Sequence, residues 1–196
     1  AVTAAQTTSG QAHRRPCEQT YRRASAAATA QQLSNAISAL TRCPDQFPVF
    51  IHDAWARAAS DSGRFRRFVV PRSGTYEDER VFGTLLSVLR DDGRPYWLRV
   101  AAASALLTQV CPTRKLGPVY LFHGRDSLSS FAGFTLEPGV AIPGSQQVQG
   151  RPVERFLDAL RNVGTSSSEL DMRLLARAMI DGLSVPGRRT LLECKP

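Results

Sequence analysis

Apolar residues recur every three or four positions in several separate segments of the chain, the spacing of an amphipathic α-helix. The longest segment contains neither Gly nor Pro and is rich in Ala and Gln, so it is predicted to be one continuous helix. Shorter segments follow, bounded by Gly, Pro or N-capping residues. Helices are predicted over residues 18–42, 49–59, 75–91, 95–110, 152–163 and 169–183. The pattern predicts a mainly α-helical protein of about six helices in antiparallel pairs.

Three other stretches lack this periodicity. Residues 1–16 are polar and are predicted to be a flexible N-terminal arm. Residues 64–74 (RFRRFVVPRSG) are predicted to be extended or irregular, with Thr75 as the N-cap of the next helix. Gly and Pro recur through residues 113–150, where short apolar runs predict a small irregular or β-hairpin insert. Residues 17–196 are thus predicted to form a single helical domain that carries this insert.

Two helix pairs in this pattern look alike. Residues 85–107 and 156–180 each contain a helix that ends in Leu-Arg, a short polar turn, and a second helix with an Ala-rich apolar face. The N-terminal helix pair, whose first helix ends at residues 39–42 and whose second begins at Val49, resembles them more loosely. A repeated helix pair of about 40 residues is typical of a short α-solenoid, in which each pair buries its apolar face against its neighbours. A plain helical bundle with the same periodicity is the alternative.

The second helix of the first pair carries a more specific pattern. Trp97 and Arg99 are followed by the run VAAASALL, and this segment resembles the second helix of a HEAT-type repeat. The best copy of such a repeat spans residues 78–110 and a fair copy spans 152–183. The resemblance implies that Arg99 pairs with an acidic residue of the interhelical turn, here Asp91 or Asp92. It covers at most about half of the chain, and the insert does not fit it.

The charge composition has an unusual distribution between residue types. The formal net charge is +8, but 23 of the 25 basic residues are Arg and only two are Lys. Such a bias is more typical of a GC-rich coding sequence than of a phosphate-binding surface, so nucleic-acid binding is not the first interpretation. No apolar run approaches the roughly 20 residues that a membrane-spanning helix needs.

Four widely spaced cysteines, together with a small, polar N-terminus that lacks Met, favour an exported protein with two disulfides. Free thiols in a cytosolic helical protein are the alternative. A helix over 18–42 would hold Cys17 and Cys43 roughly 35 Å apart, whereas bridged Cα atoms lie within about 7 Å. In an antiparallel stack of helix pairs, Cys17 and Cys111 lie at the same edge, so we expect Cys17 to pair with Cys111, and Cys43 with Cys194.

The sequence offers no catalytic motif. His13, His52 and His123 are scattered, and no nucleophile elbow, phosphate-binding loop or zinc motif occurs. Acidic clusters at 77–79 and 91–92 are explained by helix capping and turns. No metal ion or cofactor is expected, and a non-enzymatic role is favoured, although the enzyme question stays open.

Two patches could bind a macromolecule. The first interleaves cations with aromatic residues, which suits phosphate contacts with base stacking, or Arg pairing with an acidic protein. Alternatively, its apolar residues fill a groove between helix pairs while the Arg side chains stay in water. The second patch lies in the insert, where long irregular segments are often functional. The candidate binding residues are Arg64, Phe65, Arg66, Arg67 and Arg72 in the first patch, and Tyr120, Phe122, His123 and Arg125 in the second.

Taken together, these patterns predict a non-enzymatic, exported helical-repeat protein that acts as a binding or scaffold protein for a protein partner. The first alternative is a nucleic-acid-binding helical protein that uses residues 64–72 and has free thiols. The second is an enzyme of unrecognised type with its site at the insert.

Overall fold

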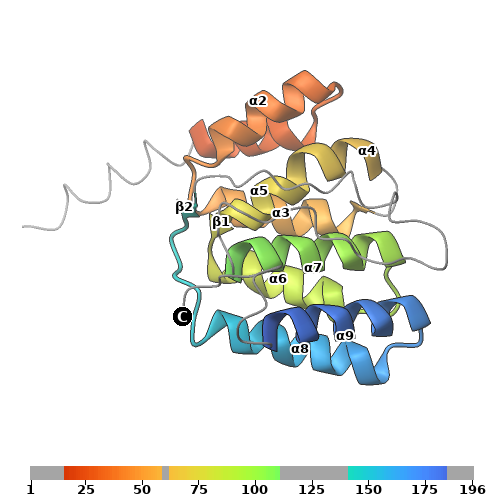
Figure 1. Cartoon of the computed structure of the whole chain (residues 1–196). Coiled ribbons are helices and arrows are strands. Elements are labelled where there is room, and N and C mark those ends of the chain that lie inside the picture. Colours follow the sequence, from red (N-terminus) through yellow and green to blue (C-terminus); the bar gives the residue numbers. More distant parts are fainter. Residues whose placement is uncertain (1–15, 59–61, 111–140, 185–196) are drawn as a thin grey trace, which may run out of the picture.

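The computed structural model describes residues 16–58, 62–110 and 141–184, and in these ranges the chain is mainly helical, as predicted (Figure 1). The elements in chain order are a helix over residues 16–25, α2 (Ala30–Leu40), α3 (Gln46–Ala56), α4 (Ser62–Arg64), the π-helix η2 (Phe65–Val69), α5 (Val70–Thr75), β1 (Tyr76–Glu77), α6 (Glu79–Arg90), α7 (Tyr96–Val110), β2 (Ile142–Pro143), α8 (Pro152–Ser166) and α9 (Leu170–Ser184). Almost all of the predicted N-terminal arm and most of the predicted insert lie outside the described residues.

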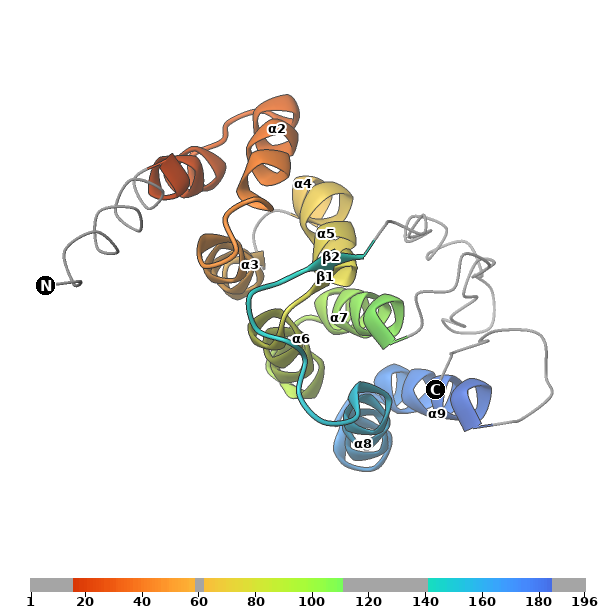
Figure 2. The same ribbon diagram turned by 90° about the vertical axis from the view of Figure 1, so that its left-hand side faces the viewer.

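The helices are stacked in two layers (Figure 2). One layer contains α3, α6 and α8, and the other contains α5, α7 and α9, so that α6 with α7 and α8 with α9 form helical hairpins. The helix over 16–25 and α2 lie at the α3 end of the stack. Helix α7 has neighbours on both sides, and every residue from Leu98 to Ala103 is buried. This burial explains why the apolar residues of α7 are not confined to one stripe.

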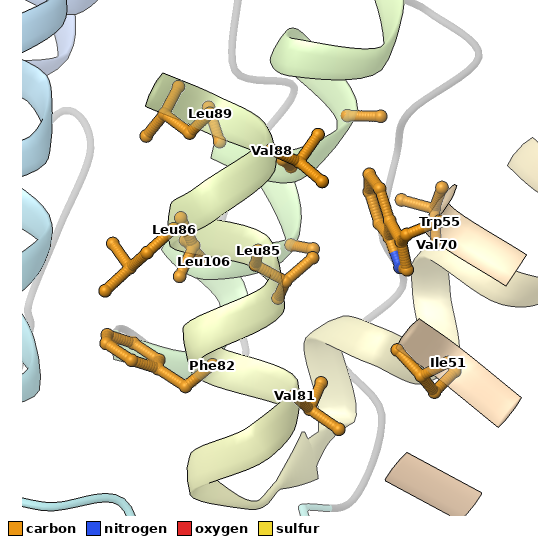
Figure 3. Close-up of a cluster of buried hydrophobic side chains, with 14 of the residues drawn as sticks. Ile51, Trp55, Val70, Val81, Phe82, Leu85, Leu86, Val88, Leu89 and Leu106 are labelled. Atoms are coloured by element: carbon orange, nitrogen blue, oxygen red, sulfur yellow. The ribbon is translucent and has the colours of Figure 1, made fainter. Parts of the chain in front are cut away.

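Helix α6 connects the two ends of the core. Phe82 and Leu86 project toward the α8 side, whereas Val81 and Val88 project toward Ile51 and Trp55 of α3 (Figure 3). Each of these side chains is at most 6% exposed. Such a two-sided apolar pattern is what a middle helix of a stack requires, because it packs against a neighbour on each side.

The predicted helix over 18–42 is wrong, because the chain breaks at residues 26–29. Thr29 has an extended backbone and caps α2, in a reciprocal pair of hydrogen bonds with Gln32. In this capping box each side chain satisfies a backbone N–H of the other residue. The chain thereby reverses, and the two helices lie beside each other instead of forming one rod.

This reversal also corrects the predicted disulfide pairing. Cys17 is bonded to Cys43, with their Cα atoms 5.6 Å apart, so Cys17 is not paired with Cys111 and Cys43 is not paired with Cys194. Cys111 and Cys194 lie outside the described residues. The break at residues 26–29 lets the chain fold back, so the two cysteines are not held apart by the length of an unbroken helix.

Residues 64–74 are helical rather than irregular. In η2 the Val70 N–H donates to the Phe65 carbonyl, which is the i to i+5 pattern of a π-helix. Pro71 occupies the first turn of α5, where its missing N–H is tolerated. Gly74 then lies against Ala105 of α7. The segment folds because its apolar residues are buried against α3 and α7 despite its Pro and Gly.

The N-cap of α6 is Asp78 rather than Thr75. The Asp78 carboxylate accepts a hydrogen bond from the backbone N–H of Arg80. Thr75 instead ends α5, where its hydroxyl donates to carbonyls of the preceding turn. The two-residue strand β1, which directly precedes Asp78, pairs in parallel with β2. Residues 142–143 of the insert therefore lie beside residues 76–77.

Residues 144–149, here called the strap, cross the N-terminus of α6. The Gln146 N–H donates to the Asp78 carboxylate and its carbonyl accepts from the Glu79 N–H. The Arg155 guanidinium forms an ion pair with the Glu79 carboxylate, with 2.7 Å between Nη2 and Oε1. Gly144 is required at the close approach, since a Cβ there would collide with the Asp78 side chain. The strap therefore ties the end of the insert to α6 and α8.

We expect the strap to loosen in acid. Burial alone would raise the pKa of Asp78, but hydrogen bonds from Arg80 and Gln146 lower it. The hydrogen bond from Arg155 likewise lowers the pKa of Glu79. A carboxyl whose pKa is lowered on folding stabilises the fold above its unfolded pKa of about 4, and this contribution disappears as the pH falls through the folded pKa.

The corresponding measurement is urea unfolding of wild type and Glu79→Gln from about pH 7 to about pH 2. The difference in the free energy of unfolding should be largest at neutral pH and shrink below about pH 4.5. Glu154→Gln is the control, because Glu154 is exposed and pairs only with the nearby Arg151 in the described structure. A Glu79→Gln difference that is independent of pH would contradict the prediction.

Candidate functional site

The described charges are unevenly distributed along the stack. Residues 16–58 and 62–77, which form the end that contains α2, carry eight Arg and four carboxylate side chains. Residues 78–110 and 141–184 carry nine of each. The excess positive charge of the described protein is therefore located at the α2 end.

Residues 78–110 and 141–184 are here called the neutral end, and most of their arginines form ion pairs within the fold. Six of them form ion pairs with carboxylates, including Arg80 with Asp78 and Arg155 with Glu79. At the α2 end, Arg22 pairs with Glu18. Among the other arginines of this end, Arg23, Arg67 and Arg72 form no ion pair with another described residue. The α2 end thus presents cations that the described part of the protein does not neutralise.

Two of these cations line a groove between α2 and the η2–α5 segment, here called the α2–η2 groove. Its volume is about 270 Å³. Its lining residues are Ser34, Ile37, Ser38, Arg67, Phe68, Pro71, Arg72 and Thr75. Hydroxyl groups and guanidinium groups thus surround an apolar floor, and no carboxylate belongs to the lining.

Local structure places these side chains. Ser34 and Ser38 are four residues apart in α2 and therefore lie on the same face of that helix. On the opposite wall, Arg67 and Phe68 belong to η2. Single-turn π-helices are rare and occur frequently at functional sites. The wider π turn buries Phe65 and Val69 while Arg67 stays exposed.

The electrostatics of the groove suit an anion. Neither Arg67 nor Arg72 forms an ion pair with another residue in the described ranges. The Arg67 guanidinium lies 5.5 Å from the centre of the Phe68 ring. A guanidinium presents several fixed N–H donors, which match the two oxygens of a carboxylate. The groove can therefore bind a carboxylate with both charge and hydrogen bonds.

The other predicted residues of the first patch have structural roles. Phe65 is 6% exposed and packs edge-on against Trp55 and Trp97. The Arg66 guanidinium lies 4.7 Å from the centre of the Trp97 ring. Arg64 donates to the carbonyls of residues 27 and 28, at the end of the first helix. The apolar residues thus fill the space between helices, as the alternative interpretation of this patch proposed.

The second predicted patch, Tyr120, Phe122, His123 and Arg125, lies outside the described residues. Sequence reasoning missed the α2 wall of the groove, which contributes Ser34 and Ser38. One signal was available, since the eleven residues of α2 contain no charged side chain. An uncharged polar helix beside an Arg-rich segment is compatible with a recognition surface.

Within the described ranges, no group of three or more His, Cys, Asp or Glu residues could hold a metal ion. The helices in the described part of the chain are too short or too polar to cross a membrane. In comparisons with known proteins, no family model matched this chain, and no match was found among curated proteins or among solved structures.

Proposed function

We propose that this chain is a non-enzymatic, exported helical-repeat protein that recognises a protein partner, and that the α2–η2 groove binds an acidic segment of this partner. One observation carries the proposal. Arg67 and Arg72 line the same groove, and no described carboxylate neutralises either of them. At the other end of the described stack, six of the nine arginines form ion pairs, whereas Arg67 and Arg72 are available for a carboxylate supplied from outside.

The size of the groove favours a peptide over a nucleic acid. A volume of about 270 Å³ accommodates a few side chains, whereas a nucleic acid is bound along an extended basic track with exposed aromatic stacking platforms. Phe65 is buried, and the Phe68 ring lies beside the Arg67 guanidinium. The sequence pattern that suggested base stacking is thus used largely within the fold.

The disulfide supports the proposed export. Stable disulfides form in oxidising compartments and are rare in the cytosol of most organisms. The Cys17–Cys43 bond joins the helix over 16–25 to the residues that follow α2.

Charge reversal in the groove tests the proposal. We expect Arg67→Glu/Arg72→Glu to weaken binding of a fluorescein-labelled acidic peptide of alternating Glu and Ser by at least about tenfold, because two charge-assisted hydrogen-bonding groups are replaced by repulsive ones. Fluorescence anisotropy at physiological salt provides the dissociation constants. A Lys–Ser peptide and an oligothymidylate of the same length are measured in parallel.

Arg90→Glu/Arg177→Glu is the matched control. It makes the same change in net charge at exposed positions of α6 and α9 that are not in the groove. An equal loss of affinity in the control would mean non-specific attraction and would contradict the proposal. Tighter binding of the oligothymidylate, lost on Arg67→Glu/Arg72→Glu, would instead establish the nucleic-acid alternative.

A further inference from the structure

Helix α2 has a second groove on its other side. This groove, here called the α2–N groove, lies between α2 and the helix over 16–25 and has a volume of about 500 Å³. Its lining residues are Thr20, Arg23, Ala26, Ala27, Gln32, Asn35, Ala36 and Ala39. None of the α2 residues that line it belongs to the α2–η2 groove. Helix α2 is therefore an uncharged ridge between two grooves.

The α2–N groove resembles the α2–η2 groove in its chemistry. Arg23 is its one charged lining residue, and this side chain is exposed and forms no ion pair with another residue that the structure describes. The remaining lining consists of uncharged polar groups and small alanines, which let another chain approach closely. Both sides of the ridge thus combine unneutralised Arg side chains with uncharged hydrogen-bonding groups.

The walls of the α2–N groove are fixed in place. The turn over 26–29 joins them at one end, and the Cys17–Cys43 disulfide joins them at the other. The Tyr21 hydroxyl also donates to Asp53 of α3. Arg64, the residue before η2, donates a hydrogen bond of 2.8 Å to the Ala28 carbonyl in this turn. A binding surface that is already ordered loses little conformational entropy when a partner binds.

We infer that the two grooves form one docking surface and that the partner segment crosses α2, placing carboxylates against Arg23 on one side and against Arg67 and Arg72 on the other. This inference rests on the proposed function of the α2–η2 groove and adds the length and charge spacing of the partner segment. A helix is about 10 Å wide, so an extended chain that crosses it needs at least about four residues between its acidic groups. A partner segment with a single acidic cluster can therefore contact only one of the two grooves.

Three labelled peptides test the inference: one Glu-Glu cluster, two such clusters joined directly, and two separated by six residues, with alternating Ser and Ala as the spacer. We expect the six-residue spacer to bind at least about tenfold more tightly than the single cluster, through linkage of two sites. The directly joined clusters have at most two residues between their outer acidic groups, so they should bind like the single cluster. Arg23→Glu should remove the advantage of the six-residue spacer and leave the single-cluster affinity within about twofold.

Two variants make the result specific. Ala39→Leu adds volume to the α2–N groove without changing charge, at an exposed position where Leu also suits a helix. It should weaken the six-residue peptide alone. Arg177→Glu is the charge control and should affect none of the three peptides. Circular dichroism and unfolding curves identify any variant that loses its fold.

The possible failures differ from each other. If the single cluster binds through Arg67 and Arg72 but the spacer length and Arg23→Glu have no effect, the docking surface stops at α2 and the inference is wrong while the proposed function stands. If no peptide responds to Arg67→Glu/Arg72→Glu, the proposed function fails, and the inference fails with it.

Discussion

Replacing Arg99 with Ala is expected to lower the free energy of unfolding by about 3 kcal/mol. The Arg99 side chain is fully buried, and its Nη1 lies 2.6 Å from the Asp92 carboxylate and 3.4 Å from that of Glu169. Its Nε donates to the Leu89 carbonyl at 3.1 Å, and Nη1 also donates to the Ser167 hydroxyl. One side chain thus connects the α6–α7 turn to the α8–α9 turn.

The expected loss has several physical sources. Without Arg99, the Leu89 carbonyl and the Ser167 hydroxyl lose a buried donor, and the space of the side chain becomes a cavity. The two carboxylates remain 37% and 40% exposed, so water compensates part of their lost ion pairs. The value is therefore placed at the lower end of the range for breaking a buried ion pair.

Urea unfolding monitored by far-UV circular dichroism measures the effect. Arg161→Ala is the matched control, because Arg161 is 61% exposed and pairs with Asp158 within the same helix. Such an exposed pair contributes about 0.5 kcal/mol or less. Arg99→Lys should fall between the two, since it keeps the charge but loses the forked donor geometry. Equal stability of Arg99→Ala and Arg161→Ala would show that Arg99 does not act as a connector.

Removing the Cys17–Cys43 disulfide is expected to cost about 3 kcal/mol of folding free energy. The bond closes a loop with a sequence separation of 26 residues, and the chain-entropy treatment predicts that order of stabilisation for a loop of this size. The helix over 16–25 spans ten residues, too few to be stable in isolation. It depends on the disulfide and on its contacts with α2 and α3.

The double variant Cys17→Ala/Cys43→Ala in urea tests this expectation, with Arg42→Ala as control because Arg42 is an exposed neighbour of the bridge. A surface substitution of that kind usually changes stability by about 0.5 kcal/mol or less. Protease sensitivity confined to the first helix should rise in the double variant. If stability and protease sensitivity both match those of the control, the disulfide does not hold the α2 end in place.

The local pattern of the sequence was sufficient for the helices of the second half of the stack. The predicted segments 95–110, 152–163 and 169–183 correspond to α7, α8 and α9. Helical periodicity arises from hydrogen bonds within one segment and from one buried stripe, so it can be recognised without knowing the neighbours. The pairing of Arg99 with Asp92, which the HEAT-type resemblance implied, is also present. Membership of that family itself stays a prediction.

The α2 end could not be predicted in the same way. Residues 26–29 (AAAT) have high helix propensity, yet the chain reverses there. The capping pattern of Thr29 and Gln32 is visible in the sequence, but the helix propensity of the surrounding residues favoured one continuous helix. Residues 64–74 contain Pro and Gly, yet they are helical, because burial of Phe65 and Val70 against other helices compensates for their low propensity.

The sequence by itself determined that the protein is mainly helical, which helices form the hairpins of its second half, and that Arg67 and Arg72 belong to a candidate binding segment. The tertiary structure decided which of the Arg side chains face a groove and which support the fold. It also decided that α2 supplies the opposite wall and that Cys17 meets Cys43. These outcomes depend on contacts between segments about 26 to 40 residues apart, and local periodicity carries no information about such contacts.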